Sequence, residues 1–181
     1  YDFLKHKFSL SREGVIPVHF FRLRPPNFPT IRLAQLAGVY SRRSNLFSSI
    51  IEAQSLEQLY AIFEGSTSSF WNTHYTFEKS SKSSSKTLTK AFINLLIINT
   101  IVPIKFAFHK FNRYSNPDNV LAIIRNIPME HNSIVDKFHS LYAFGKTALD
   151  SQALIQLKHM YCSKNKCLQC AIGSAILNRN S

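Results

Sequence analysis

The chain has 181 residues, of which 45% are hydrophobic, a length and composition typical of one globular domain with its own core and unlike a disordered chain. Its 22 Lys and Arg residues outnumber 10 Asp and Glu, which gives a formal net charge of +12 and predicts attraction to polyanions such as nucleic acid, or to an acidic protein. The odd number of cysteines, three, argues against a disulfide framework, and we expect a cytoplasmic protein.

We expect residues 1–29 to form an irregular or partly extended arm and a Pro-rich loop, with residues 12–14 as a turn, followed by a helical domain over residues 30–181. Pro29 or Thr30 should begin the first helix of that domain. Its predicted apolar stripe includes Ile31, Leu36 and Val39, with Arg32 and Gln35 pointing elsewhere. Because the sequence begins at Tyr1 and not at Met, we also expect an upstream domain of the same protein.

A helix is predicted over residues 45–53, and residues 55–58 have the form of a capping box that opens another helix reaching Phe63. The aromatic segment that follows has Trp71, Tyr75 and Phe77 spaced for an extended piece. Residues 78–90 are rich in Ser and Lys, which is typical of a mobile loop or of a basic tract that contacts phosphates.

Thr87 or Thr89 should cap a long apolar helix. We predict that this helix lies in the core and not in a membrane, because Asn94, Asn99, Thr100, Pro103 and Lys105 interrupt the apolar run that a spanning helix needs. Pro103 should kink or end it.

Further helices are predicted to begin at residues 116–118, at Asn132 or Ser133 and at Asp150 or Ser151, with Pro128 and Gly145 as stop signals. A last helix covers residues 167–177. The predicted fold class is therefore all-α: an irregular bundle of about eight helices with an extended N-terminal arm.

All three cysteines lie close together near the C-terminus, where His159, Cys162, Cys167 and Cys170 give the pattern H-x2-C-x4-C-x2-C. On helices, His159 shares a face with Cys162, and Cys167 shares one with Cys170. Three thiolates and one imidazole are a suitable ligand set for a closed tetrahedral zinc site. We therefore predict a zinc ion that staples the last two helices.

Two alternatives to zinc stay open. Plant-type ferredoxins use C-x4-C-x2-C to hold an iron–sulfur cluster, but with a distant fourth Cys that this sequence lacks. Cysteine is also among the most buried residue types, so the three thiols can be ordinary packing residues without any cofactor.

Clustered cations mark a second candidate site, for nucleic-acid phosphates. Guanidinium groups match phosphate geometry, and Lys supplies point charges. The alternative is that Arg22, Arg24 and Arg32 bind backbone carbonyls within the fold and that the lysines of residues 79–90 lie in a solvated loop. The candidate nucleic-acid-binding residues are Arg22, Arg24, Arg32, Arg42, Arg43, Lys79, Lys82, Lys86 and Lys90.

Several segments resemble one known family. The sequences of residues 21–37 (FRLRPPNFPTIRLAQLA), 70–75 (FWNTHY), 98–103 (INTIVP) and 150–173, which include the CLQCAIG run, resemble the carboxy-terminal half of domain-of-unknown-function family 2851, an uncharacterised family found mostly in Bacteroidetes. The resemblance implies no established activity. Family members also have a strand-rich amino-terminal half with acidic and His residues similar to those of metal-dependent nucleases, and this chain has no counterpart of it, so no catalytic residue carries over.

No enzyme signature is recognisable: the sequence has no Gly-rich phosphate loop, no H-E-x-x-H and no G-x-S-x-G. Whether the chain is an enzyme is left open. The first functional prediction is a basic, metal-stapled accessory domain that assists nucleic-acid binding by a larger protein. The alternative is a scaffold or protein-interaction domain that does not bind nucleic acid.

Overall fold

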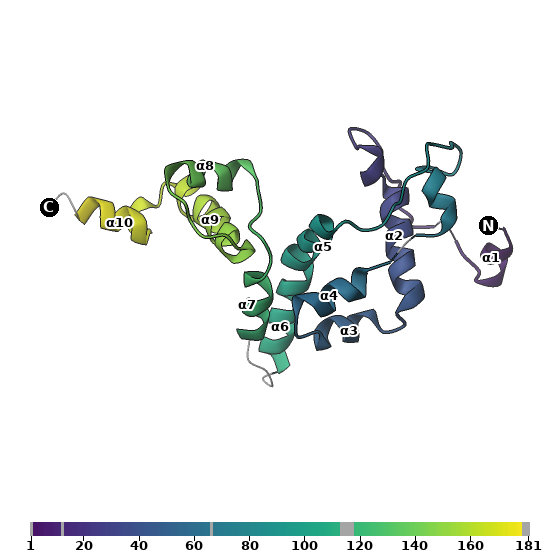
Figure 1. Cartoon of the computed structure of the whole chain (residues 1–181), viewed down its shortest axis with the longest axis horizontal. Helices are drawn as coiled ribbons and strands as arrows, with labels where there is room; N and C mark the ends of the chain where they lie inside the picture. The colour runs from purple at the N-terminus through teal and green to yellow at the C-terminus, as the bar shows by residue number, and fades with distance from the viewer. Residues whose placement is uncertain (1, 12, 66, 113–117, 179–181) are drawn as a thin grey trace. The chain divides into compact units, whose positions relative to one another are not determined.

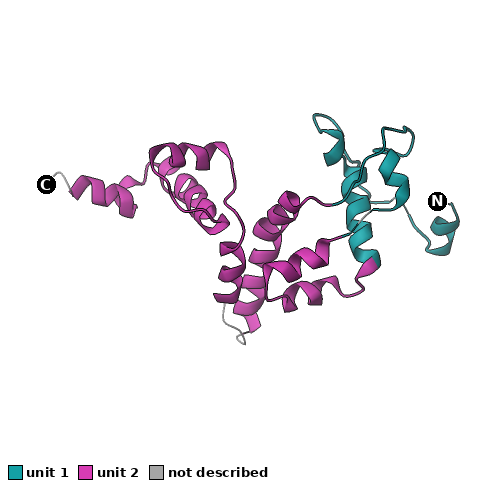
Figure 2. Ribbon diagram, viewed as in Figure 1, with its two compact units in different colours: residues 1–41, 65–87 teal, residues 42–64, 88–181 magenta. Residues whose placement is uncertain are grey.

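The computed structural model describes residues 2–11, 13–65, 67–112 and 118–178. These residues form helices joined by irregular segments, with no strand among them, which confirms the predicted all-α class (Figure 1). The contacts divide the chain into two units: unit 1 comprises residues 1–41 and 65–87, and unit 2 comprises residues 42–64 and 88–181 (Figure 2).

Unit 1 is built around α2, which begins at Pro29, one of the two predicted starts. Its buried positions are Ile31, Gln35 and Val39, one helical turn apart, whereas Leu36 is exposed. The predicted stripe was thus wrong at Leu36 and Gln35, because the Gln35 amide has a buried partner, the Lys86 carbonyl oxygen, 2.8 Å away. The helical elements of unit 1 are α1 (Asp2–Lys7), the 3-10 helix η1 (Pro25–Asn27), α2 (Pro29–Arg42, whose last residue belongs to unit 2) and the 3-10 helix η2 (Ser69–Thr73).

The N-terminal segment was predicted to be an irregular or partly extended arm, and it contains one short helix, α1. The ring of Phe28 packs edge-on against those of Phe20 and Tyr75, and Thr30 donates to the Tyr75 carbonyl oxygen at 2.5 Å. The Pro-rich loop is therefore in contact with the segment around Tyr75, and both belong to unit 1. Arg12 of the predicted turn lies outside the described residues, and η2 stands where an extended piece was predicted.

Unit 2 contains the remaining helices, and three of its predicted caps are confirmed. Ser55, Thr89 and Asn132 each accept a backbone N–H of the first turn that would otherwise lack a partner. Asn116 and Pro117, predicted to open a helix, lie outside the described residues. The elements are α3 (Leu46–Glu52), α4 (Leu56–Phe63), α5 (Lys90–Leu96), the π-helix η3 (Ile97–Ile101), α6 (Val102–Asn112), α7 (Asp118–Arg125), α8 (Ser133–Leu141), α9 (Ala148–Met160), the 3-10 helices η4 (Cys162–Lys164) and η5 (Cys167–Gln169), and α10 (Ala171–Asn178).

The long apolar helix does not end at Pro103. A π-helical turn precedes the proline, in which the Val102 N–H bonds to the Ile97 carbonyl oxygen, and the helix then continues as α6. A widened turn of this kind accommodates a residue that has no N–H of its own.

By length and composition alone the run Lys90–Asn112 is long and apolar enough to cross a membrane, as are many core helices. Ile93, Ile97 and Lys105 of this run are buried within unit 2, whereas Leu95, Ile104 and Phe111 are exposed, and 28% of its most apolar window is buried.

The cap of α9 lies earlier than predicted. Thr147 caps this helix, and its hydroxyl and the Asp150 carboxylate exchange hydrogen bonds with each other's backbone N–H in a reciprocal capping box. Asp150 is therefore the third helical residue and not the cap. Gly145 has φ +45° and lies beyond the end of α8 at Leu141, not at its C-terminus as predicted.

Candidate functional site

Four of the predicted nucleic-acid-binding residues are exposed cations of unit 1: Arg22, Arg24, Lys79 and Lys82. None forms an ion pair with a carboxylate in the described part of the chain. Arg22 has left-handed backbone, φ +61°, and its guanidinium lies 5.1 Å from the centre of the Phe21 ring. These four side chains therefore present positive charge to solvent.

Two other predicted contacts in unit 1 have internal partners. Arg32 donates to Asn27 Oδ1 at 2.5 Å and to Gln35 Oε1 at 2.8 Å, and desolvation lowers the pKa of its guanidinium. Lys86 is only 5% exposed. Its ammonium donates to the carbonyl oxygens of Asn72 and Ser84 at 3.3 and 3.0 Å, and lies 4.1 Å from the centre of the Tyr75 ring. Lys86 is thus a buried anchor and not a surface cation.

The last three predicted contacts belong to unit 2. Arg42 and Arg43 donate to the carbonyl oxygens of Glu64 and Ala61, 3.3 and 3.1 Å away, at the C-terminal end of α4. Cations are favourable there because the last carbonyls of a helix lack intrahelical donors. Lys90 lies 4.7 Å from the centre of the Tyr60 ring. Arg42 and Arg43 thus bind backbone carbonyls, the arrangement that was considered from the sequence for other arginines.

Lys79 and Lys82 lie on a loop that folds back on η2. The backbone N–H groups of Ser81 and Ser84 donate to the carbonyl oxygens of Thr73 and Asn72, at 2.7 and 2.8 Å. The buried Lys86 ammonium fixes the base of this loop from inside. We call residues 78–85 the basic loop; its backbone is held, whereas the side chains of Lys79 and Lys82 are exposed.

Next to the basic loop is a group of rings that we call the aromatic surface, formed by Phe70, Trp71, His74 and Phe77. The rings of Phe70 and His74 are stacked and nearly parallel, with their centres 4.1 Å apart. The centre of the Phe77 ring lies 6.2 Å from that of Phe70 and 5.2 Å from that of Trp71. Phe77 is 73% exposed and Phe70 is 40% exposed. From the sequence, His74 was considered as a remote ligand or base and the aromatic stretch as a segment that docks onto another protein. A role in nucleic-acid binding was not predicted for them, although the closeness of aromatic residues to Lys in the sequence was a signal for it.

A hollow of about 400 Å³ adjoins the aromatic surface at Trp71. Its wall on α2 is made of small residues, including Ala34, Ala37 and Gly38, and its other side includes Thr67. The Thr67 hydroxyl is buried and has no hydrogen-bond partner within the described structure. An orphaned buried hydroxyl is uncommon and marks a place where a ligand group or water can bind.

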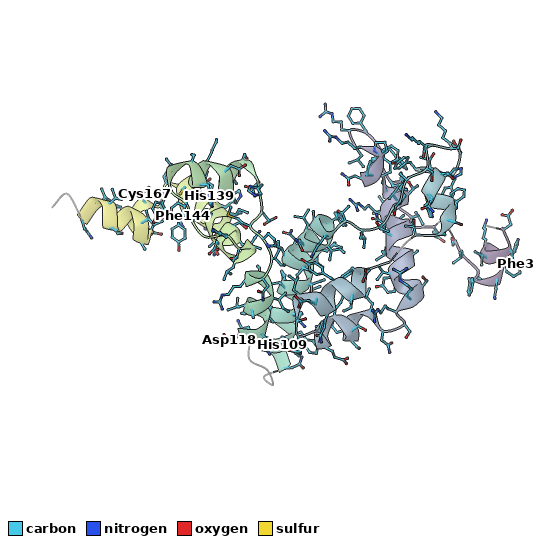
Figure 3. All side chains as sticks on the ribbon, viewed as in Figure 1. Phe3, His109, Asp118, His139, Phe144 and Cys167 are labelled. Atoms are coloured by element: carbon cyan, nitrogen blue, oxygen red, sulfur yellow. The ribbon has the colours of Figure 1, made fainter. Side chains whose placement is uncertain are left out.

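The three cysteines meet in unit 2 around one apolar hollow of about 190 Å³, which we call the cysteine hollow. Cys170 is buried, whereas Cys162 and Cys167 are mostly exposed. The 3-10 helices η4 and η5 carry the first two cysteines, and Figure 3 labels Cys167 on the segment that leads into α10. The other lining residues are Phe138, Leu157, Tyr161, Ile172, Gly173 and Ile176.

Gly173 explains why this segment packs so closely. A Cβ at Gly173 would lie 2.3 Å from the Cys167 carbonyl oxygen, so only glycine allows α10 to approach the turn that carries Cys167.

His159, the fourth predicted metal ligand, is exposed near the end of α9 and does not line the cysteine hollow. Among the described residues, no group of three or more His, Cys, Asp or Glu side chains is arranged to hold a metal ion. The fold therefore brings the three predicted sulfur ligands to one hollow, and it does not bring the predicted imidazole there.

Comparison with known proteins identifies a family but no activity. The family model described as "Protein of unknown function (DUF2851)" matches residues 1–133, a span that includes the aromatic surface and the basic loop and ends before the cysteine hollow. No curated protein and no solved structure matches the chain. The chain belongs to the DUF2851 family of proteins of unknown function.

Proposed function

We propose that this chain is a basic helical domain that helps a larger protein to hold nucleic acid. The observation that carries the proposal is the exposed positive charge of Arg22, Arg24, Lys79 and Lys82 in unit 1, which no carboxylate neutralises within the described residues. Unit 1 has nine Lys and Arg residues against three acids. Phosphates that meet such cations release condensed counterions, and this release favours binding at low salt.

The charge proposal is tested by measuring binding of a labelled DNA or RNA over a range of salt concentrations. Replacing the four cations by Gln should weaken binding and reduce the slope of log K against log salt by roughly 0.7–0.9 for each phosphate that is no longer neutralised. A control with the same net charge replaces Lys110, Lys137, Lys158 and Lys164, exposed lysines of unit 2. Equal binding by the two variants would show that only overall charge matters and would overturn the proposal.

The metal-binding part of the proposal concerns the cysteine hollow. The presence of three cysteines around one apolar hollow is the support for a soft metal ion, with zinc first and an iron–sulfur cluster as the alternative, although the cysteines would have to draw closer together to bind it. The sulfurs would act as thiolates, and His159 would have to turn toward the hollow to complete a four-ligand set.

Metal analysis of the purified chain, together with an absorption spectrum, tests this part directly. The expected result is about one zinc per chain and no visible absorption, with the zinc absent from Cys170→Ser and kept in the control Ser163→Ala. Visible charge-transfer bands would indicate a cluster instead. A chain that takes up neither metal when refolded in its presence would leave ordinary thiols as the answer.

A protein-interaction domain is the second candidate, and α10 favours it. Ile172, Ile176 and Leu177 of this helix are all about half exposed, and Leu168 just before it is 80% exposed. Exposed apolar patches are often contact surfaces for another protein. If this role is correct, Ile176→Ser should weaken association with a protein partner without changing nucleic-acid binding.

A further inference from the structure

We propose that the aromatic surface and the basic loop of unit 1 bind single-stranded nucleic acid, with an unpaired base stacked on Phe77 or Phe70 and neighbouring phosphates at Lys79 and Lys82. This inference rests on the proposed function and makes it narrower, because it names the form of nucleic acid and the side chains that distinguish it.

The first support is ring exposure. A phenylalanine that is 73% exposed, as Phe77 is, presents most of a ring face to solvent, and Phe70 behind it is supported by the parallel His74 ring. The His74 Nδ1 lies 3.0 Å from the Phe70 carbonyl oxygen and 3.0 Å from the Thr73 hydroxyl, which fixes the orientation of the imidazole. Rings held in this way form a platform on which any base can stack, so that binding does not depend on the nucleotide sequence.

The second support is the position of charge beside the rings. The antiparallel bridge between His74 and Ser80 turns the chain back on itself, so Lys79 and Lys82 lie on the segment that pairs with the ring-bearing segment. Proteins that bind single strands usually combine aromatic rings, on which bases stack, with cations that contact the phosphates of the nucleic-acid backbone. Glu78 is the only acid among residues 65–87 and opposes this attraction.

The third support is the hollow beside Trp71. The hollow is lined by small and polar side chains, including Thr67 and Ser68, and its volume of about 400 Å³ leaves space for a group that lies beside the rings. A duplex cannot use these features, because its bases are stacked and paired inside the helix. The surface also presents a short 3-10 helix and a loop, and no long helix that would read a major groove.

The test compares three labelled probes by fluorescence anisotropy at low and moderate salt: an oligothymidylate of about twelve nucleotides, an abasic strand with the same phosphates, and a duplex of equal length. The chain should bind oligothymidylate at least roughly fivefold more tightly than the abasic strand, the lower end of what one stacked base contributes. Phe77→Leu should remove that preference and leave abasic binding unchanged, whereas Phe77→Tyr should keep it. Phe111→Leu, at an equally exposed phenylalanine of unit 2, is the matched control.

The charge variants separate this inference from the function on which it rests. Replacing Lys79 and Lys82 by Gln should weaken binding of both strands, and Glu78→Gln should tighten both. No binding of any probe would overturn the proposed function together with this inference. Equal binding of oligothymidylate and abasic strand, unaffected by Phe77→Leu, would overturn the inference alone and would assign the exposed rings to contact with a protein.

Discussion

The ammonium of Lys105 lies 2.8 Å from the carbonyl oxygen of Ala53 in the interior of unit 2. It also donates to the carbonyl oxygens of Ile50 and Ile51, at 2.9 and 2.6 Å. These carbonyls are at the C-terminal end of α3, where a helix has acceptors without intrahelical donors. Lys105 is 2% exposed, and this burial lowers the pKa of its ammonium. The lysine therefore caps α3 from a neighbouring helix.

Replacing Lys105 by Met should destabilise the chain strongly. Met keeps roughly the length of the side chain but leaves the buried carbonyl oxygen of Ala53 and two partly buried ones without this donor, and an unsatisfied buried group costs about 1–3 kcal/mol. Allowing for relaxation, we expect a decrease of roughly 2–4 kcal/mol in the free energy of unfolding, measured by urea denaturation followed by circular dichroism.

The control for this prediction is Lys110→Met, an exposed position on the same helix, α6. It should change the free energy of unfolding by less than about 0.5 kcal/mol. Similar decreases in the two variants would mean that the Lys105 hydrogen bonds contribute nothing beyond what a surface lysine contributes.

Asp150 should make stability depend on pH in the acid range. Its carboxylate accepts hydrogen bonds from the Thr147 hydroxyl at 2.7 Å and from the backbone N–H groups of Thr147 and Lys146, which lowers the pKa of Asp150 below 3.8. The unfolded carboxyl then takes up its proton at a higher pH than the folded one. The contribution is thus fully present above pH 3.8 and is lost as the pH falls through the folded pKa.

Asp150→Asn provides the comparison. Because the carboxylate is partly open to solvent, its charge should contribute only a few tenths to about 1 kcal/mol at neutral pH. The difference in unfolding free energy between the unmodified chain and the variant should shrink as the pH is lowered below 3.8. A difference that stays constant down to about pH 2 would contradict the assigned cause.

Gly173→Ala should open the cysteine hollow. The added methyl group would meet the Cys167 carbonyl oxygen at 2.3 Å, and overpacking of this kind costs typically about 1–3 kcal/mol. We expect α10 to separate from η5 more often, so that the buried Cys170 thiol reacts roughly tenfold faster with an alkylating reagent, followed by mass spectrometry. Ala175→Ser, at an exposed position of α10, should leave the rate unchanged. Unaltered protection of Cys170 would show that α10 accommodates the methyl group.

Gln35→Leu should loosen unit 1. The Gln35 amide donates to the Lys86 carbonyl oxygen at 2.8 Å and accepts from Arg32, so an apolar side chain leaves a buried acceptor unpaired at a cost of about 1–3 kcal/mol. Amide hydrogen exchange should then be faster in the segment around Lys86. The exposed neighbour Leu36 is the control, and Leu36→Gln should leave exchange there as it was. Faster exchange around Lys86 in Leu36→Gln than in Gln35→Leu would instead support the apolar stripe predicted from the sequence, in which Leu36 is buried.

Local signals in the sequence predicted local structure well. The caps Ser55, Thr89 and Asn132 and the helix start at Pro29 depend only on residues within one turn, and each lies at a predicted position. The same kind of signal exists for Thr147, which stands three residues before Asp150 in the spacing of a capping box. It was missed because Asp150 is itself a good capping residue.

Contacts distant in the sequence were not predictable in this way. Gln35 and Lys105 are polar residues at buried positions, and the carbonyl oxygens to which they donate lie more than fifty residues away, so the surrounding residues do not indicate that they are buried. The same limit applies to the candidate sites. From their spacing in the sequence, the three cysteines were predicted to lie together, and they line one hollow, but His159 does not join them. The sequence around Lys86 likewise gave no sign that its ammonium is enclosed.

The chain crosses between the two units three times, since residues 42–64 belong with the C-terminal part and residues 65–87 return to the N-terminal part. A single cut cannot therefore separate two intact units, because a fragment that contains all of unit 1 also carries residues 42–64 of unit 2. During synthesis, α2 must wait for residue 87 to leave the ribosome before unit 1 is complete, and α3 and α4 are made well before the helices that cover them. Apolar surfaces of both units are therefore uncovered at the same time until the later segments have been made.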